Sequence, residues 1–197
     1  MYRNCKTIIL ASQSPRRQQY LSSIGLEFTV QVASICEEPE AGERPDSFVL
    51  RMAEEKAAAV SRDNPDSWVI SGDTVVCLGE KIIGKPQSEE NAVELLMRLS
   101  GKEHEVKTGF SVVCRTENIS TTRVVTTRVQ FAEYTEQLAR AYVATGECMD
   151  KAGAYGIQGK GCVLVQSITG SYSNVVGLPL HELLEVLMQL CVIQLAG

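Results

Sequence analysis

The sequence is poor in the residues on which several classes of protein depend. It contains two histidines, which excludes a histidine-rich metal site and gives little support to a serine–histidine–aspartate triad. Its seven cysteines stand singly with no CxxC pair. This argues against a zinc ribbon or a disulfide scaffold and favours reduced thiols, most of them small core residues, in a cytosolic protein. The apolar stretch 178–196 is broken by polar residues such as His181 and Glu185, so it predicts a helix rather than a membrane span.

The charge balance is mildly acidic. The 197 residues carry 19 basic and 24 acidic side chains, a net charge of −5, which argues against non-specific binding to nucleic acid or to an anionic membrane. A locally basic pocket is compatible with this balance. With 44% hydrophobic and 22% charged residues, the composition is that of a globular protein. Because no repeat, low-complexity tract or long linker divides the chain, we expect one domain, residues 1–197.

Short apolar runs and helix signals alternate along the chain. Residues 7–11 are a β-prone run that leads to Pro15, where Ser14 is placed to cap a helix that stops at Gly25. Further helices are predicted after Pro45, over 88–101 and 135–146, and after Pro179. Further strands are predicted over 28–32, 68–70, 74–78, 81–86, 105–114, 119–131 and 162–168, with turns at 79–80 and 117–118. This order of elements predicts an α/β protein with a mixed sheet, in which 105–131 is an antiparallel hairpin.

The first candidate site is the corner at residues 12–17, between the first strand and the first helix. A helix N-terminus presents unpaired N–H groups and the positive end of the helix dipole, which together attract anions. Arg16 and Arg17 stand against their own dipole, which a bound polyanion would explain because guanidinium groups fit phosphate oxygens. The alternative is that both arginines are solvated surface residues.

The second candidate is Asp73, within residues 71–74, which interrupts an apolar strand sequence. A buried carboxylate without a partner is costly, so an acid here indicates a metal site, a paired cation or a general base. The alternative is a Gly-Asp turn between two strands.

Other candidates are single charged residues and one glycine-rich run. Lys85 lies at a strand exit before a proline and Lys56 lies on the predicted second helix; either is a candidate ligand for an anion or a solvated lysine. Glu37, in a loop, is either a second carboxylate for a divalent metal or an ordinary loop acid. Four glycines between 153 and 161 suit close backbone approach to a ligand, or a flexible loop.

Four segments, taken in order, form one pattern. They are residues 9–17 (ILASQSPRR), 55–57 (EKA), 71–74 (SGDT) followed by 84–86 (GKP), and 150–158 (DKAGAYGIQ). With 176–180 (VGLPL), this pattern resembles the Maf family of nucleoside triphosphate pyrophosphatases over almost the whole chain. Each segment is weak by itself, but the ordered set is specific, and it favours the functional interpretation of Arg16, Arg17, Asp73 and Lys56.

The resemblance implies a cytoplasmic enzyme that uses a divalent metal, Mg²⁺ or Mn²⁺, to hydrolyse a nucleoside triphosphate between its α and β phosphates. It implies an elongated α/β fold with a mixed sheet flanked by helices and a central cleft, similar to inosine triphosphate pyrophosphatases. Members are often dimers, so the expected partners are the nucleotide and a second copy of the chain, without nucleic acid or membrane. By motif position Asp73 is the expected proton acceptor. The other expected active-site residues are Ser12 and Arg17 for substrate, Lys56 and Lys85 for catalysis, and Glu37 with Asp73 for the metal.

Three positions indicate a branch of this family. Arg16, Thr74 and Gln158 resemble the branch that acts on dTTP, UTP and related pyrimidine nucleotides. The branch that acts on 7-methyl-GTP tends to have tryptophan, glutamine and glutamate there. Neutral amide and hydroxyl groups suit a uracil or thymine, whereas a cationic methylated guanine favours an aromatic platform and a carboxylate.

The resemblance therefore predicts hydrolysis of dTTP and UTP, and of modified pyrimidine nucleotides as further candidates, to the monophosphate and pyrophosphate. One alternative is a 7-methyl-GTP pyrophosphatase of the same family, and another is a non-catalytic nucleotide sensor that regulates cell division. A nucleic-acid-binding module is a third, but the acidic total and the lack of a basic stripe with interleaved aromatic residues argue against it.

Overall fold

The computed structural model describes residues 1–196, which fold into two compact units. Unit 1 comprises Met1–Asp73, Thr108–Val125 and the C-terminal segment from Gly177, and unit 2 comprises Thr74–Lys107 and Thr126–Val176. The longest strands, β4 (Trp68–Leu78), β6 (Glu103–Cys114) and β7 (Ile119–Phe131), each contribute residues to both units. The larger sheet has the strand order β3-β2-β4-β6-β7-β8, with β5 paired to β4. Parallel and antiparallel pairs occur together in it, so the prediction of a mixed α/β fold is confirmed.

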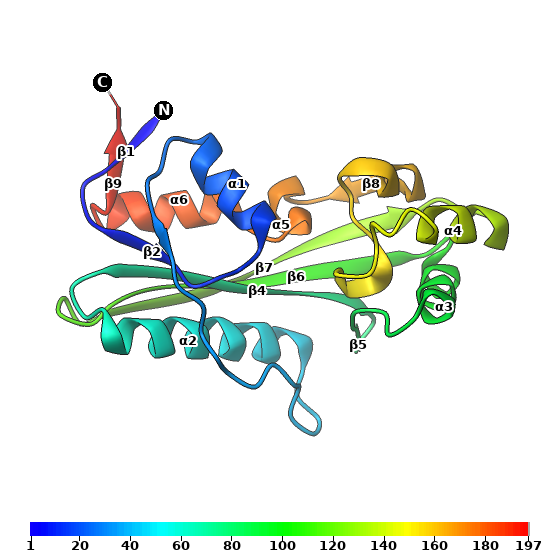
Figure 1. Cartoon of the computed structure of the whole chain (residues 1–197), viewed down its shortest axis with the longest axis horizontal. Helices are drawn as coiled ribbons and strands as arrows, with labels where there is room; N and C mark the ends of the chain where they lie inside the picture. The colour runs from blue at the N-terminus through cyan, green and yellow to red at the C-terminus, as the bar shows by residue number, and fades with distance from the viewer. Residues whose placement is uncertain (197) are drawn as a thin grey trace. The chain divides into compact units, whose positions relative to one another are not determined.

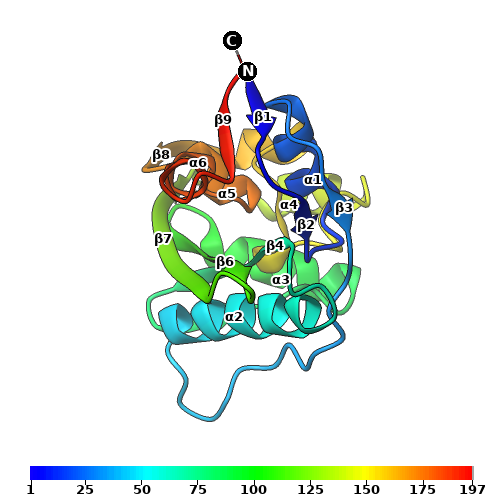
Figure 2. The same ribbon diagram turned by 90° about the vertical axis from the view of Figure 1, so that its left-hand side faces the viewer.

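In unit 1, short parallel strands lie between two layers of helix. β2 (Ile8–Leu10) pairs in parallel with β3 (Thr29–Val30) and with the start of β4, and all its side chains are buried, as expected for a strand covered on both faces. Helix α2 (Pro45–Asp63) covers one face, while α1 (Pro15–Ser23) and α6 (Leu180–Gln189) cover the other (Figures 1 and 2). Alternate residues of β2 therefore enter different cores: Ile9 packs with Ala57 and Val60 of α2, and Ile8 and Leu10 pack with Leu21 and Leu183.

The two ends of the described chain also pair in unit 1. β1 (Tyr2–Asn4) and β9 (Ile193–Leu195) form an antiparallel two-stranded sheet, visible side by side in Figure 2. The sequence pattern did not predict this pair, because the apolar stretch 178–196 indicated one helix. In the structure α6 ends at Gln189 and the chain reverses at Cys191, whose φ is +52°. The prediction of a helix through 178–196 is therefore wrong after Gln189.

Unit 2 has its own hydrophobic core. β5 (Lys81–Ile83) is antiparallel to the end of β4, and β8 (Val165–Thr169) is antiparallel to the second half of β7. Helices α3 (Glu89–Leu99) and α4 (Glu136–Val143) lie side by side (Figure 1) and begin within a residue of the predicted starts, where the side chains of Ser88 and Thr135 accept backbone hydrogen bonds. Two 3₁₀ turns, η1 (Ala152–Ala154) and η2 (Gly159–Leu164), precede β8, and α5 (Tyr172–Val176) follows it.

Three sequence expectations are corrected by the structure. β4 is continuous through residues 71–73, so the predicted interruption is wrong: Ser71 is buried and its hydroxyl donates to the Ala53 carbonyl of α2 at 2.5 Å. Residues 162–164 form part of η2 rather than a strand. Cys5, Cys36, Cys162 and Cys191 are exposed and only Cys77, Cys114 and Cys148 are buried, so most cysteines are not core residues.

Candidate active site

The corner between β2 and α1 in unit 1 is built around Arg17. Ser14 precedes the helix as predicted, but its side chain makes no capping bond; instead the Ser12 hydroxyl oxygen accepts from the Ser14 amide at 3.3 Å. The same hydroxyl oxygen accepts from Arg17 Nη1 at 2.9 Å, and Arg17 Nε donates to the Gly177 carbonyl at 2.7 Å. These contacts hold the guanidinium group in one orientation at the carboxyl end of β2.

Arg17 is 8% exposed, so the alternative of a solvated surface arginine is wrong for this residue. Burial lowers the pKa of its guanidinium group; the charge of Arg16 adds to this effect, while Asp73 and Glu37 oppose it. An arginine nevertheless keeps its charge under any ordinary condition. Unit 1 therefore holds a fixed, largely desolvated positive charge, whereas Arg16 is only half buried.

Lys56 on α2 brings two carboxylates together. Its Nζ lies 2.8 Å from Asp73 Oδ1 and 2.9 Å from Glu37 Oε2. The side chain of Lys56 is 10% exposed and that of Asp73 15%, while Glu37 remains 54% exposed at the edge of the cluster. Lys56 is therefore not a solvated lysine, and Asp73 is an acid inside a continuous strand, paired with a cation.

Two missing side chains allow this approach. A Cβ atom on Gly109 of β6 would lie 2.2 Å from the Val49 carbonyl oxygen, so glycine lets the α2 backbone approach the sheet. A Cβ on Gly72 would lie 3.1 Å from the Gly109 carbonyl oxygen, a tight contact, and 3.7 Å from the Arg17 guanidinium carbon, an ordinary contact distance that places the residue before Asp73 beside that cation. The glycine of the 71–74 segment thus marks a close contact within unit 1 rather than a turn.

The loop that carries Glu37 is held to α2 by Arg51, a residue that sequence reasoning missed. Arg51 donates to Glu43 Oε1 at 2.7 Å and Oε2 at 2.6 Å, and to the Glu38 carbonyl at 3.0 Å. These hydrogen bonds lower the pKa of the Glu43 carboxyl group to about 2. The two-point carboxylate contact fixes the loop at Glu43, and the bond to the Glu38 carbonyl fixes it one residue after Glu37. A sequence signal was absent because Arg51 looks like any other charged residue of an amphipathic helix.

Two carboxylates, those of Asp73 and Glu37, are placed to hold a divalent metal. Among residues 1–196, no group of three or more histidine, cysteine, aspartate or glutamate side chains is arranged to hold a metal ion. Asp73 and Glu37 do converge, since both contact Lys56 Nζ. Mg²⁺ bound to a nucleotide commonly takes one or two carboxylates, with phosphate oxygens and water completing its shell. The pair therefore fits a metal that arrives with a phosphate substrate.

The other predicted residues lie in unit 2. Lys85 is exposed and directly follows Gly84, whose carbonyl accepts from the Gly153 amide at 3.0 Å. That bond joins the segment of Lys85 to the glycine-rich segment, in which Gln158 is exposed immediately before η2. Thr74 follows Asp73 in β4 and is half buried.

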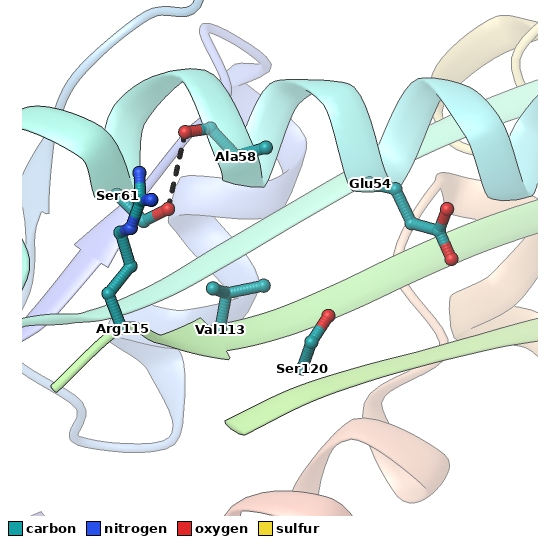
Figure 3. A pocket seen from close by; sticks show the side chains of 6 residues that line it. All are labelled: Glu54, Ala58, Ser61, Val113, Arg115 and Ser120. Carbon is teal, nitrogen blue, oxygen red and sulfur yellow. Dashed lines mark hydrogen bonds between the residues drawn. The ribbon is translucent and has the colours of Figure 1, made fainter. Parts of the chain in front are cut away.

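A hollow elsewhere in unit 1 contains none of the predicted site residues. It has a volume of about 390 Å³ and lies between α2 and the end of the β6–β7 hairpin (Figure 3). Its lining residues are Glu54, Ala58, Ser61, Val113, Arg115 and Ser120. The Ser61 hydroxyl donates to the Ala58 carbonyl of its own helix at 3.2 Å, so this polar group is already satisfied. The charged cluster around Lys56 is the stronger candidate site.

The fold and this cluster define a class: a mixed α/β protein with a buried arginine at a strand-to-helix corner and a lysine that bridges two carboxylates. The chain belongs to the family described as Maf-like protein, whose model matches residues 7–190 and so spans both units.

Relatives match nearly the full length. A dTTP/UTP pyrophosphatase of Desulfotalea psychrophila is 54% identical over 99% of this chain and 100% of its own. The dTTP/UTP pyrophosphatase of Myxococcus xanthus is 47% identical over 91% of this chain and 90% of its own. One from Bacillus cereus is 44% identical over 94% and 91%.

A solved structure, that of the Staphylococcus aureus Ham1 protein, is 16% identical and superposes with a TM-score of 0.49 over 65% of this chain and 73% of its own. Within the described residues, no helix combines the length and apolar character needed to cross a membrane.

Proposed function

We propose that this protein hydrolyses dTTP and UTP between the α and β phosphates, releasing the nucleoside monophosphate and pyrophosphate. The observation that carries the proposal is the Lys56 ammonium group held between Asp73 and Glu37, in a chain whose near full-length relatives are named dTTP/UTP pyrophosphatases. Those relatives are named as enzymes for pyrimidine nucleotides. They do not favour a 7-methyl-GTP pyrophosphatase or a non-catalytic sensor.

The charges within unit 1 suit attack on a triphosphate. The barrier to phosphoryl transfer is lowered mainly by positioning and by neutralising phosphate charge. Arg17 offers a fixed guanidinium group and Lys56 an ammonium group for this purpose, and Lys85 is proposed to contribute from unit 2. Ser12 orients Arg17, because its hydroxyl oxygen accepts a hydrogen bond from Arg17 Nη1.

Asp73 is proposed as the proton acceptor for the attacking water. Its ion pair with Lys56 holds the carboxylate in one direction, as a general base requires. Glu37 and Asp73 would hold Mg²⁺ or Mn²⁺, which when bound neutralises phosphate charge and lowers the pKa of water. In this arrangement Lys56 balances the two carboxylates until the substrate and its cation arrive.

Base selection is assigned to neutral groups and one arginine. Thr74 and Gln158 offer a hydroxyl and an amide, which can both donate to and accept from the carbonyl and imide groups of uracil or thymine. Arg16, half buried beside Arg17, is proposed to contact the nucleotide as well. A cytoplasmic location and a homodimer remain predictions that cell fractionation and analytical ultracentrifugation would test.

The test is pyrophosphate release from purified protein with dTTP, UTP, CTP and 7-methyl-GTP, each with Mg²⁺, Mn²⁺ or EDTA. We expect turnover of dTTP and UTP that requires a metal. Asp73→Asn should abolish release while nucleotide binding by calorimetry is retained, because the amide preserves shape but cannot take a proton. Asp66→Asn, a change at an exposed acid of unit 1, is the matched control and should remain active. Full activity of Asp73→Asn would disprove its role, and no release from any nucleotide by the wild type would disprove the function.

A further inference from the structure

The glycine-rich segment of unit 2 is not a flexible loop. Residues Gly156 to Gly161 surround the exposed Gln158, and their backbone amides are bound by side chains from outside the segment. Those side chains, Tyr142 and Glu147, come from the end of α4 and the turn that follows it. Neither residue belongs to the motif that carries Gln158.

Glu147 binds the segment on the C-terminal side of Gln158. Its Oε2 accepts from the Lys160 amide at 3.0 Å and its Oε1 accepts from the Gly161 amide at 3.2 Å. One carboxylate thus takes two successive amides, the arrangement in which charge-assisted hydrogen bonds are strongest. Burial raises the pKa of Glu147, but these two bonds, with the charge of Lys151, outweigh it and leave the pKa below its usual range.

Tyr142 binds the segment on the N-terminal side. Its hydroxyl oxygen accepts from the Gly156 amide at 3.1 Å, and its O–H donates to Glu147 Oε1 at 3.4 Å. The two side chains are therefore one hydrogen-bonded unit with a contact on each side of Gln158. Tyr142 is itself buried, at 3% exposure, in the core of unit 2, so its hydroxyl has a fixed position.

The glycines of the segment are required by these contacts. A Cβ on Gly159, whose φ is +66°, would lie 2.8 Å from Glu147 Oε2. A Cβ on Gly161 would lie 2.2 Å from the Gly156 carbonyl oxygen and 2.8 Å from the Tyr142 hydroxyl. The segment packs closely on itself and on the Tyr142–Glu147 pair, so the backbone is held on both sides of Gln158.

We propose that Tyr142 and Glu147 are positioning residues for pyrimidine recognition: they fix the backbone on both sides of Gln158 so that its amide meets the base in one orientation. This inference rests on the proposed function, in which Gln158 contacts the base. It assigns a role in specificity to two residues that do not themselves touch the nucleotide. To distinguish uracil from cytosine, the Gln158 amide must keep one orientation. An amide that rotates can present either its oxygen or its NH₂ group and can therefore hydrogen-bond to either base.

The test compares binding of α,β-methylene-UTP and α,β-methylene-CTP by calorimetry, in parallel with kcat/KM for UTP and CTP. The variants are Glu147→Gln and Tyr142→Phe, each also combined with Gln158→Ala. In Glu147→Gln the side-chain NH₂ group faces the Lys160 or the Gly161 amide, so one of these two hydrogen bonds is lost. Tyr142→Phe removes the oxygen that accepts from the Gly156 amide. Glu136→Gln is the matched control, since Glu136 lies on α4, the helix that carries Tyr142, in an exposed ion pair with Arg140.

We expect the CTP-over-UTP ratio of dissociation constants, which measures the preference for UTP, to fall about tenfold in Glu147→Gln, the effect of losing one hydrogen bond to a charged group. It should fall less in Tyr142→Phe and stay unchanged in Glu136→Gln. In the Gln158→Ala background neither substitution should lower the ratio further. Hydrogen exchange of the Lys160 and Gly161 amides should accelerate in Glu147→Gln, with circular dichroism reporting that the variant is folded.

Three results would overturn the inference. The first is an unchanged ratio in folded Glu147→Gln and Tyr142→Phe. The second is an equal fall in the ratio with and without Gln158. The third is a wild type that binds both analogues equally. A wild type that discriminates between the analogues but releases no pyrophosphate would instead disprove the proposed function alone, because the binding assay does not depend on turnover.

Discussion

His104 makes the stability of this protein fall on mild acidification, before most carboxylates titrate. The residue is 2% exposed on β6, with its Nε2 2.8 Å from the Tyr155 hydroxyl and its ring centroid 4.7 Å from that of Phe131, the two rings being nearly perpendicular. Burial lowers the pKa of His104 from 6.5 to about 4. Between these values the unfolded chain takes up a proton that the folded protein refuses, so stability is complete above pH 6.5 and is lost as the pH falls towards 4.

The magnitude follows from the two pKa values. A difference from 6.5 to about 4, at about 1.36 kcal/mol per pH unit, amounts to about 3 kcal/mol once the pH is below both values. From pH 7 to pH 5 the same linkage gives a loss of about 1.8 kcal/mol, which is a large fraction of the net stability of a small protein. Tyr155, the hydrogen-bond partner of His104, lies three residues before Gln158, so this part of the core adjoins the glycine-rich segment.

The assay is urea unfolding from pH 7 to pH 5 on the wild type, His104→Phe and His181→Gln. His104→Phe should be less stable at pH 7, because the Tyr155 hydroxyl loses its partner, but its stability should fall less with acid by about 1.8 kcal/mol. His181→Gln should follow the wild type, since the His181 side chain is 79% exposed. Parallel curves for the wild type and His104→Phe would refute the reasoning, as would a His104 ring that titrates near pH 6.5 by NMR.

Two further predictions concern unit 2. Lys85→Ala should lower kcat/KM for UTP about 10- to 150-fold, the effect of losing one charge-assisted contact of about 1.5–3 kcal/mol. Lys81→Ala, at an exposed lysine of β5, is the control and should leave kcat/KM unchanged. Equal values for both variants would remove Lys85 from the mechanism. Gly161→Ala should lower the free energy of unfolding by about 1–3 kcal/mol in urea, because its Cβ would lie 2.2 Å from the Gly156 carbonyl oxygen. Gly84→Ala, with open space at the Cβ position, should lower it far less. A Gly161→Ala protein as stable as the wild type would show that the segment is not closely packed.

The sequence was most informative where chemistry is local. Local signals located α1, α2, α3 and α4 to within a few residues: a proline at the start of α1 and α2, helical spacing of apolar residues in α2 and α3, and a serine or threonine before α1, α3 and α4. The apolar run of β2 and the hairpin turn, where Asn118 has a φ of +53°, were equally clear. These signals depend on residues close in sequence, whose mutual geometry the backbone itself imposes. The break predicted in β4 failed for the opposite reason, because Asp73 is accommodated by a lysine 17 residues away.

By itself, then, the order of amino acids determined which side chains are available to bind a polyanion and on which kind of element each one sits. Tertiary structure decided which of them meet: Lys56 with Asp73 and Glu37, and Arg17 with a carbonyl 160 residues further along the chain. It alone also revealed that Tyr142 and Glu147 hold the backbone around Gln158. For Arg17, Tyr142 and Glu147 the physical reason is that their partners are backbone amides and carbonyls, which nearly every residue possesses. A donor or acceptor common to all positions leaves no trace in a sequence until folding brings it beside a charged side chain.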